Sequence, residues 1–140
     1  MRTALLCTLV LLLATPAVAS ERQAREANPD VADSLAQILE DVGDWAELAR
    51  SCGDDPCELM NEEAKAIGDA LEALWPVIGS PDGKREAVDA AYQQLIAHLD
   101  AFERWMPQTD IEDLDAHCRR WTGTREKIDR FKRTMRQLAS

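Results

Sequence analysis

Two cysteines separated by four residues are the pair in this chain best suited to react with each other. Cys52 and Cys57 enclose the turn-forming stretch GDDP in the segment CGDDPC. Gly and Pro in a short spacer favour a tight turn, and an oxidising compartment favours a bridge between the two thiols. The spacing therefore predicts a disulfide between Cys52 and Cys57 across a turn.

The two histidines offer a second kind of chemistry, metal binding. His98 and His117 lie on either side of the turn signal MPQTD at 106–110, so antiparallel helices would place them at similar height. Together with Cys118 or Asp113 they would supply donors for Zn or Cu. Because neither segment carries a second histidine at i+3 or i+4, we expect two partly exposed histidines rather than a tight metal centre.

Cys118 stays unpaired when Cys52 and Cys57 bridge. It falls on an apolar stripe, where a free cysteine behaves as a small hydrophobic side chain. A redox role would require exposure and an activated thiolate. We expect packing to be its role, and the reactive thiol remains the alternative.

The residue patterns that other classes of reaction require are missing from the sequence. The sequence has no Ser/His/Asp arrangement, no Gly-rich phosphate loop and no recognisable pair of catalytic carboxylates, so we expect a protein that is not an enzyme. The formal net charge is -10, which argues against nucleic acid as a partner because phosphate binding needs a basic surface.

Apolar residues recur at spacings of three and four in four segments, which is typical of amphipathic helices. The turn signals CGDDPC, GSPDG and MPQTD separate these segments. Four helices joined by short turns predict an all-α, antiparallel, up-down-up-down four-helix bundle. The expected core positions are Val31, Leu35, Ile38, Val42, Trp45 and Ala49; Met60, Ala64, Ile67, Leu71, Leu74 and Ile78; Val88, Tyr92, Leu95, Leu99, Phe102 and Met106; and Ile111, Leu114, Cys118, Trp121, Ile128 and Met135.

The last segment is cationic although the chain is acidic. Five of the sixteen lysines and arginines lie within TGTREKIDRFKR at 122–133. Most of the acidic residues lie in the first three helical segments, so ion pairing between helices is the expected use of these cations. Binding of an external anion is the alternative.

The N-terminal stretch MRTALLCTLVLLLATPAVAS has the pattern of a secretory signal peptide: Arg2, an apolar run and a small-residue cleavage site. The apolar run is too short to span a membrane. We expect cleavage before Ser20, which removes residues 1–19 and leaves one domain at 20–140 with a net charge of -11. The expected product is a periplasmic monomer without a membrane span.

The C-terminal half resembles the cytochrome b562 family of periplasmic four-helix-bundle haem-b proteins, over about fifty residues from Glu86 to Arg133. AYQQLIAHLDAF, DIEDLDA and TGTREKIDRFKR carry the resemblance. Thr124 and Arg125 fall on a Thr-Arg pair of that family. Asp129 falls on the position of its axial histidine.

The resemblance implies haem-b binding and electron transfer with a periplasmic redox partner. Asp129 and Arg125 would lie at the haem slot, and Leu35 is the expected counterpart of the axial methionine. Because the family's two ligands are replaced, a haem-free binding or interaction module of the cell envelope is the alternative. In that case apolar side chains would fill the slot, namely Trp75 with Leu35, Ile128 and Met135. Asp129 would turn toward Arg125 or solvent.

Overall fold

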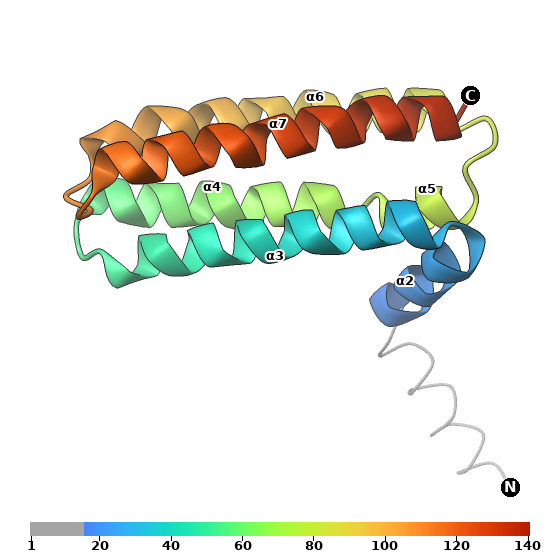
Figure 1. Ribbon diagram of the computed structural model, residues 1–140, viewed down its shortest axis with the longest axis horizontal. Coiled ribbons are helices and arrows are strands. Elements are labelled where there is room, and N and C mark those ends of the chain that lie inside the picture. Colours follow the sequence, from blue (N-terminus) through green and yellow to red (C-terminus); the bar gives the residue numbers. More distant parts are fainter. Residues whose placement is uncertain (1–15) are drawn as a thin grey trace, which may run out of the picture.

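The computed structural model describes residues 16–140, and this part of the chain consists of helices and connecting turns, with no strand. Four long helices lie side by side (Figure 1): α3 (Pro29–Ser51), α4 (Asp55–Glu72), α6 (Arg85–Trp105) and α7 (Leu114–Leu138). Three short elements accompany them: α2 (Pro16–Ala27), α5 (Trp75–Gly79) and the 3₁₀ turn η1 (Met106–Gln108). The prediction of an all-α fold is confirmed for the described residues.

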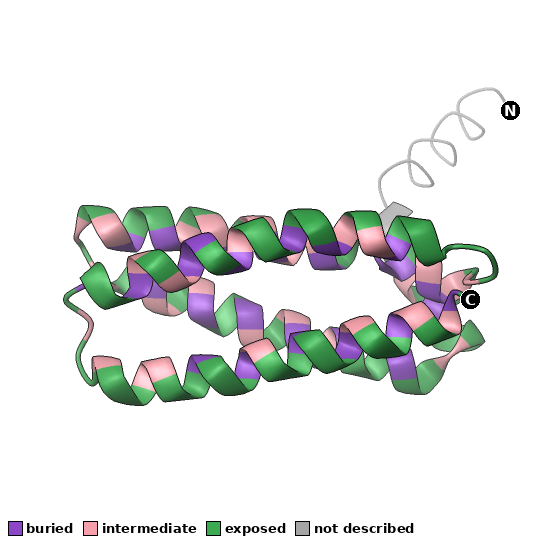
Figure 2. Ribbon diagram, turned by 90° about the horizontal axis from the view of Figure 1, so that it is seen from above, coloured by how far each residue is buried: buried purple, intermediate pink, exposed green. Residues whose placement is uncertain are grey.

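Each long helix packs against two of the others. Helix α3 contacts α4 and α7, and α6 contacts the same two helices from the other side. Buried residues line the inner faces of the four helices, whereas their outer faces are exposed (Figure 2). Since an amphipathic helix buries its apolar stripe against its neighbours, this arrangement places one continuous core along the length of the molecule.

The expected core positions are nearly all buried. The exceptions are at the beginning of the last segment, where Ile111, Leu114 and Cys118 are only partly covered. Helix α7 begins at Leu114 rather than at Ile111, because Asp113 adopts a left-handed backbone conformation with φ 55°. A helix cannot continue through such a residue, so Ile111 lies in the connection before α7. All three residues pack against the core while staying partly exposed.

Local signals explain where α3 and α4 begin. The Asn28 side chain accepts a hydrogen bond from the backbone N–H of Val31, and the Asp54 side chain accepts one from Cys57. Each cap satisfies a backbone donor that has no partner inside its helix. A proline occupies the first turn of both helices, where its missing N–H costs nothing.

Two short helices were not expected from the sequence. The second helical segment is divided in two: α4 ends at Glu72, and α5 begins at Trp75 with Pro76 in its first turn. Helix α2 packs against α5 and α3. Gly79 allows the close approach, because a Cβ there would lie 3.1 Å from Cγ of Gln23.

The predicted signal peptide lies largely outside the described residues, which begin at residue 16. Helix α2 runs through the predicted cleavage point before Ser20. Gln23 and Ala24, which approach Gly79 on α5, belong to the part that would remain after cleavage. Among the helices described, none has the length and apolar character needed to cross a membrane.

Candidate functional site

The residues of the expected haem slot lie in very different surroundings. Leu35 is completely buried in the core, whereas Asp129 is exposed on α7. Ile128, the neighbour of Asp129, is completely buried. Successive helical residues differ by 100° around the axis, so packing of Ile128 against the core turns Asp129 outward. This agrees with the expectation that Asp129 faces Arg125 or solvent, and solvent is what it faces.

Arg125 binds carboxylates on α6 and not Asp129. Its Nη1 donates to Oε1 of Glu103 at 2.8 Å and lies 3.3 Å from Oδ1 of Asp100. Trp121 donates its indole N–H to the same Glu103 oxygen at 2.9 Å. Of the two outcomes expected for Asp129, exposure to solvent is therefore the one observed, and Arg125 pairs with α6 instead. Arg125 thus helps to join α7 to α6.

Asp129 has one electrostatic effect within the core. Burial of the Tyr92 hydroxyl, with a smaller contribution from the Asp129 carboxylate, raises the pKa of Tyr92. The hydroxyl donates to the carbonyl oxygen of Ile128 at 3.5 Å. The neutral phenol is thus the form that suits this position, because a buried phenolate beside a carboxylate would be destabilised.

These residues do not fit a haem. A haem b held between axial ligands needs two donors that face each other across an apolar slot. Leu35 has no donor atom, and the Asp129 carboxylate is a hard oxygen ligand on the exposed side of α7. The residues expected to fill the slot all belong to the continuous core: Leu35, Trp75, Ile128 and Met135.

The two histidines contact different helices. Nδ1 of His98 lies 2.7 Å from Oε2 of Glu63 on α4. His117 packs edge-on against Trp45 of α3, with ring centroids 6.1 Å apart. Neither belongs to a group of three or more metal-binding side chains within the described residues. Cys118 is half-buried, with its Sγ 3.6 Å from Sδ of Met106.

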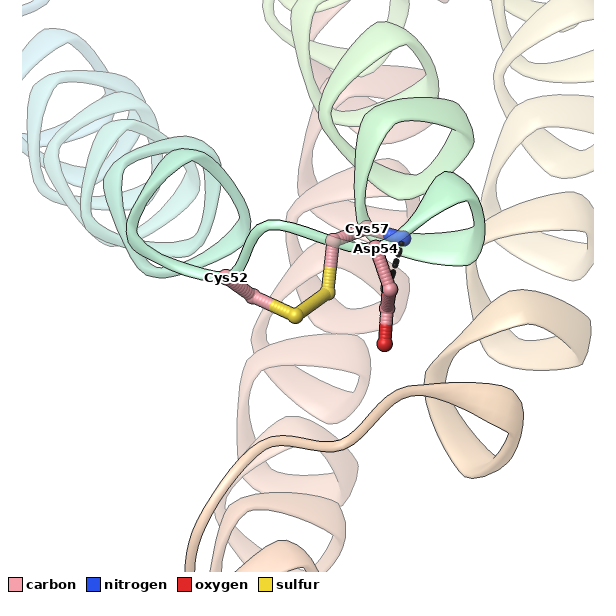
Figure 3. Close-up of side chains that lie close together, drawn as sticks. All are labelled: Cys52, Asp54 and Cys57. Atoms are coloured by element: carbon pink, nitrogen blue, oxygen red, sulfur yellow. Dashed lines mark hydrogen bonds between the residues drawn. A yellow bond between two sulfur atoms is a disulfide. The ribbon is translucent and has the colours of Figure 1, made fainter.

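The predicted pair Cys52 and Cys57 forms a disulfide, with Cα atoms 5.8 Å apart. Asp54, inside the same turn, accepts backbone hydrogen bonds through both carboxylate oxygens: Oδ1 from Cys57 at 2.9 Å and Oδ2 from Asp110 at 3.0 Å. The turn between α3 and α4 is thereby tied to the connection between η1 and α7. Figure 3 shows the disulfide and the Asp54 carboxylate on the same side of the turn.

Two surface hollows follow one another along the line where α3 meets α7. One of about 400 Å³ is lined by Asp41, Asp44, Trp45, Arg119, Arg120, Gly123, Thr124 and Lys127. The next, of about 270 Å³, is lined by Ser34, Gln37, Ile38, Lys127, Arg130, Phe131 and Thr134. We call these residues together the α3–α7 groove; Lys127 borders both hollows.

Small side chains make room for the groove, and apolar ones form its floor. Gly123 has no side chain, and a Cβ there would meet nothing within 4 Å. Trp45, Ile38 and Phe131 are almost fully buried beneath the hollows. The guanidinium of Arg120 stacks over Trp45, 4.2 Å from the ring centroid, which is a favourable cation–π distance.

The rim of the groove is mainly cationic. Helix α7 contributes Arg119, Arg120, Lys127 and Arg130, against two carboxylates from α3. Nζ of Lys127 pairs with Asp41 at 2.9 Å. The three arginines form no ion pair within the described residues.

The use expected for the cations of α7 is therefore confirmed only in part. Three of them pair with acids on neighbouring helices: Arg125, Lys127 and Arg136. The sequence does contain a signal for the cations that border the groove, because positions 119, 120, 127 and 130 fall on one side of a helix. It does not show that a groove opens beside them.

Comparison of the chain with family models, with curated proteins and with solved structures finds no match. The resemblance to cytochrome b562 therefore rests on the quoted residues of the C-terminal half alone.

Proposed function

We propose that this chain is an exported, haem-free interaction module of the cell envelope, built as an antiparallel up-down-up-down four-helix bundle. The side-by-side packing of α3, α4, α6 and α7 supports the architecture. The signal-peptide pattern and the disulfide support a periplasmic location. Burial of Leu35 and exposure of Asp129 favour the haem-free form over the electron carrier.

The observation that carries the function is a set of arginines along the α3–α7 groove that form no ion pair within the described part of the chain. Arg119 and Arg130 are eleven residues apart on one helix, which corresponds to about 16 Å. Cations spread over this length match several anionic groups in a row better than one small anion. We infer that the occupant is an acidic segment of a partner protein, lying along the groove and contacting its partly apolar walls.

Charge has two opposing effects on such a complex. The chain as a whole carries a net charge of -10, so an acidic partner is repelled at long range. Salt screens this repulsion over about 10 Å at 0.1 M, while the arginines attract carboxylates at contact distance. The acidic segment therefore binds in the groove and not elsewhere on the surface. Bidentate hydrogen bonds between arginine and carboxylate groups would fix its orientation there.

The test is binding of a short, labelled amphipathic peptide with glutamates along one helical face, followed by fluorescence anisotropy. The double variant Arg119→Glu/Arg130→Glu is expected to lose binding. The matched control Arg50→Glu/Arg104→Glu changes the net charge equally at exposed positions outside the groove and is expected to retain it. Equal loss in both variants would mean that only overall charge matters and would contradict the proposal.

Location of the peptide provides the second readout. A nitroxide on the peptide should broaden backbone amide signals of α7 between residues 119 and 134 and those of α3 that face them. Broadening centred on another helix pair would overturn the groove as the site. Binding to anionic phospholipid vesicles but not to the peptide would replace the protein partner with a membrane surface.

A further inference from the structure

The disulfide turn holds a second set of donor atoms that the interaction module does not use. The sulfur atoms of Cys52 and Cys57 and a carboxylate oxygen of Asp54 all lie within 4.8 Å of one another. Figure 3 shows them projecting from the same side of the α3–α4 turn, toward the chain that leads into α7. Cys57 is completely buried and Cys52 partly so, which holds the donors in a limited space.

We propose that the reduced form of this turn is a Zn²⁺ site, with the thiolates of Cys52 and Cys57 and the carboxylate of Asp54 as ligands and water in the fourth position. Two cysteines separated by four residues have a spacing that structural zinc sites use. Zn²⁺ accepts sulfur and oxygen ligands together in a tetrahedral arrangement. A carboxylate is a poor ligand for Cu⁺, which prefers soft donors, so the mixed set favours zinc.

The surroundings of the turn favour a divalent cation. The turn borders a surface hollow of about 690 Å³, and the charged side chains that line it are Asp54, Asp110, Glu112 and Asp113, with His117 beside them. Among residues 16–140, no lysine or arginine lines it. Carboxylates around one hollow create a negative potential that concentrates cations there.

Asp54 is held in place within the turn. Its two oxygens accept backbone hydrogen bonds from Cys57 and from Asp110, which fixes the carboxylate between the two connections. Each oxygen keeps a further lone pair for a metal ion. Such outer hydrogen bonds orient ligands and strengthen metal binding.

The metal and the disulfide compete for the same two sulfurs. A dithiol reductant attacks one sulfur, which breaks the Cys52–Cys57 bond and forms a mixed disulfide; its second thiol then releases the protein as a dithiol. The protein gains two electrons and two protons, and the reductant becomes a disulfide. Binding of Zn²⁺ by both sulfurs afterwards releases two protons to solvent.

The change falls on Cys52, because Cys57 is completely buried. Zn–S bonds of about 2.3 Å in a tetrahedral site place the two sulfurs roughly 3.8 Å apart, so Cys52 and Cys57 must separate on metal binding. Gly53 lies between them, is exposed, and a Cβ there would meet nothing within 4 Å. Cys52 lies just beyond the end of α3 in an extended conformation, so its movement does not require α3 to unwind.

Titration of the full-length protein with Co²⁺, a spectroscopic substitute for Zn²⁺, tests the proposal. Protein reduced with a phosphine should bind one equivalent and show thiolate-to-cobalt charge-transfer bands that Zn²⁺ displaces. Oxidised protein should show neither. Reduced protein without these bands, or equal binding by oxidised and reduced protein, would overturn the proposal.

Variants identify the ligands. Cys57→Ser should abolish the bands, whereas Cys118→Ser, which removes the third thiol of the described chain, should leave them unchanged. Asp54→Asn keeps both cysteines and a residue suited to capping α4, and should weaken Zn²⁺ binding at least tenfold. Its matched control is Asp55→Asn, which alters the exposed neighbour and should have no effect.

Circular dichroism of each variant separates loss of the metal site from loss of folding. If Asp54→Asn and Asp55→Asn bind Zn²⁺ equally while both remain helical, Asp54 is not a ligand and the proposed site is wrong. Bands that persist in helical Cys57→Ser protein would likewise place the metal elsewhere.

Discussion

The indole Nε1 of Trp45 on α3 donates a hydrogen bond to the hydroxyl of Thr124 on α7 at 3.2 Å, within the core and across 79 residues of sequence. Trp45 also packs edge-on against Phe102 of α6 and Trp121 of α7. Both partners of the hydrogen bond are almost fully buried. The contact therefore fixes how α7 lies against α3 at the floor of the α3–α7 groove.

Replacing Thr124 by Val should destabilise the protein by about 1–3 kcal/mol, because the buried indole N–H of Trp45 loses its acceptor while the shape of the side chain is kept. Urea denaturation followed by circular dichroism measures the change. Thr122→Val is the control, since that side chain is exposed and its hydroxyl donates to the carbonyl oxygen of Cys118 within α7. Similar losses in both variants would show that the hydrogen bond contributes nothing specific.

The disulfide should contribute modestly to stability. It closes a short loop with a sequence separation of 5, and the chain-entropy relation then gives about 2 kcal/mol. Cys52→Ser/Cys57→Ser should lower the free energy of unfolding by this amount under oxidising conditions. Mass spectrometry of unreduced protein should find neither thiol free; alkylation of both would contradict the bridge.

Tyr92 should make the protein less stable at alkaline pH. Its pKa is raised in the folded state by burial and by the Asp129 carboxylate. The neutral Tyr92 side chain therefore makes its full contribution to the free energy of unfolding at any pH below the unfolded-state pKa of about 10. Above that pH the unfolded chain ionises first and stability falls. Between pH 8 and pH 11, the free energy of unfolding of the wild-type protein should fall by roughly 1.4 kcal/mol relative to that of Tyr92→Phe. A constant difference across this range would contradict the assignment.

Haem added to the purified protein should produce no Soret band of an axially ligated complex. The combined variant Asp129→His/Leu35→Met, which restores the ligand types of the cytochrome b562 family, should also fail to bind haem. Its histidine would replace an exposed side chain, and its methionine would lie in a filled core. A six-coordinate haem spectrum from the variant would show that α7 can rotate and that the slot persists. Wild-type protein that purifies with haem would restore the electron-carrier function.

Much of the fold was predictable because its signals are local. Apolar residues at spacings of three and four define the buried faces of α3, α4 and α6, and Asn28 and Asp54 mark where two helices begin. The disulfide was predictable for the same reason, since its two cysteines enclose a single turn. Helix α2 was missed because its sequence PAVASERQAREA has no apolar side chain larger than valine, and its position depends on contact with α5 and α3. Helix α5 was missed because its residues continue the apolar pattern of the preceding segment as far as Ile78.

Local patterns in the chain were enough to predict four amphipathic helices, the reactive cysteine pair and the concentration of cations on the last helix. What those cations do depends on packing between helices, because the burial of Ile128 fixes the rotation of α7 about its axis. That rotation points Arg125 at Asp100 and Glu103 of α6, leaves Asp129 in solvent and places Arg119 and Arg130 along an open groove. Helical spacing gives the angles between side chains on one helix, but the neighbour that each side chain meets depends on residues far away in the chain.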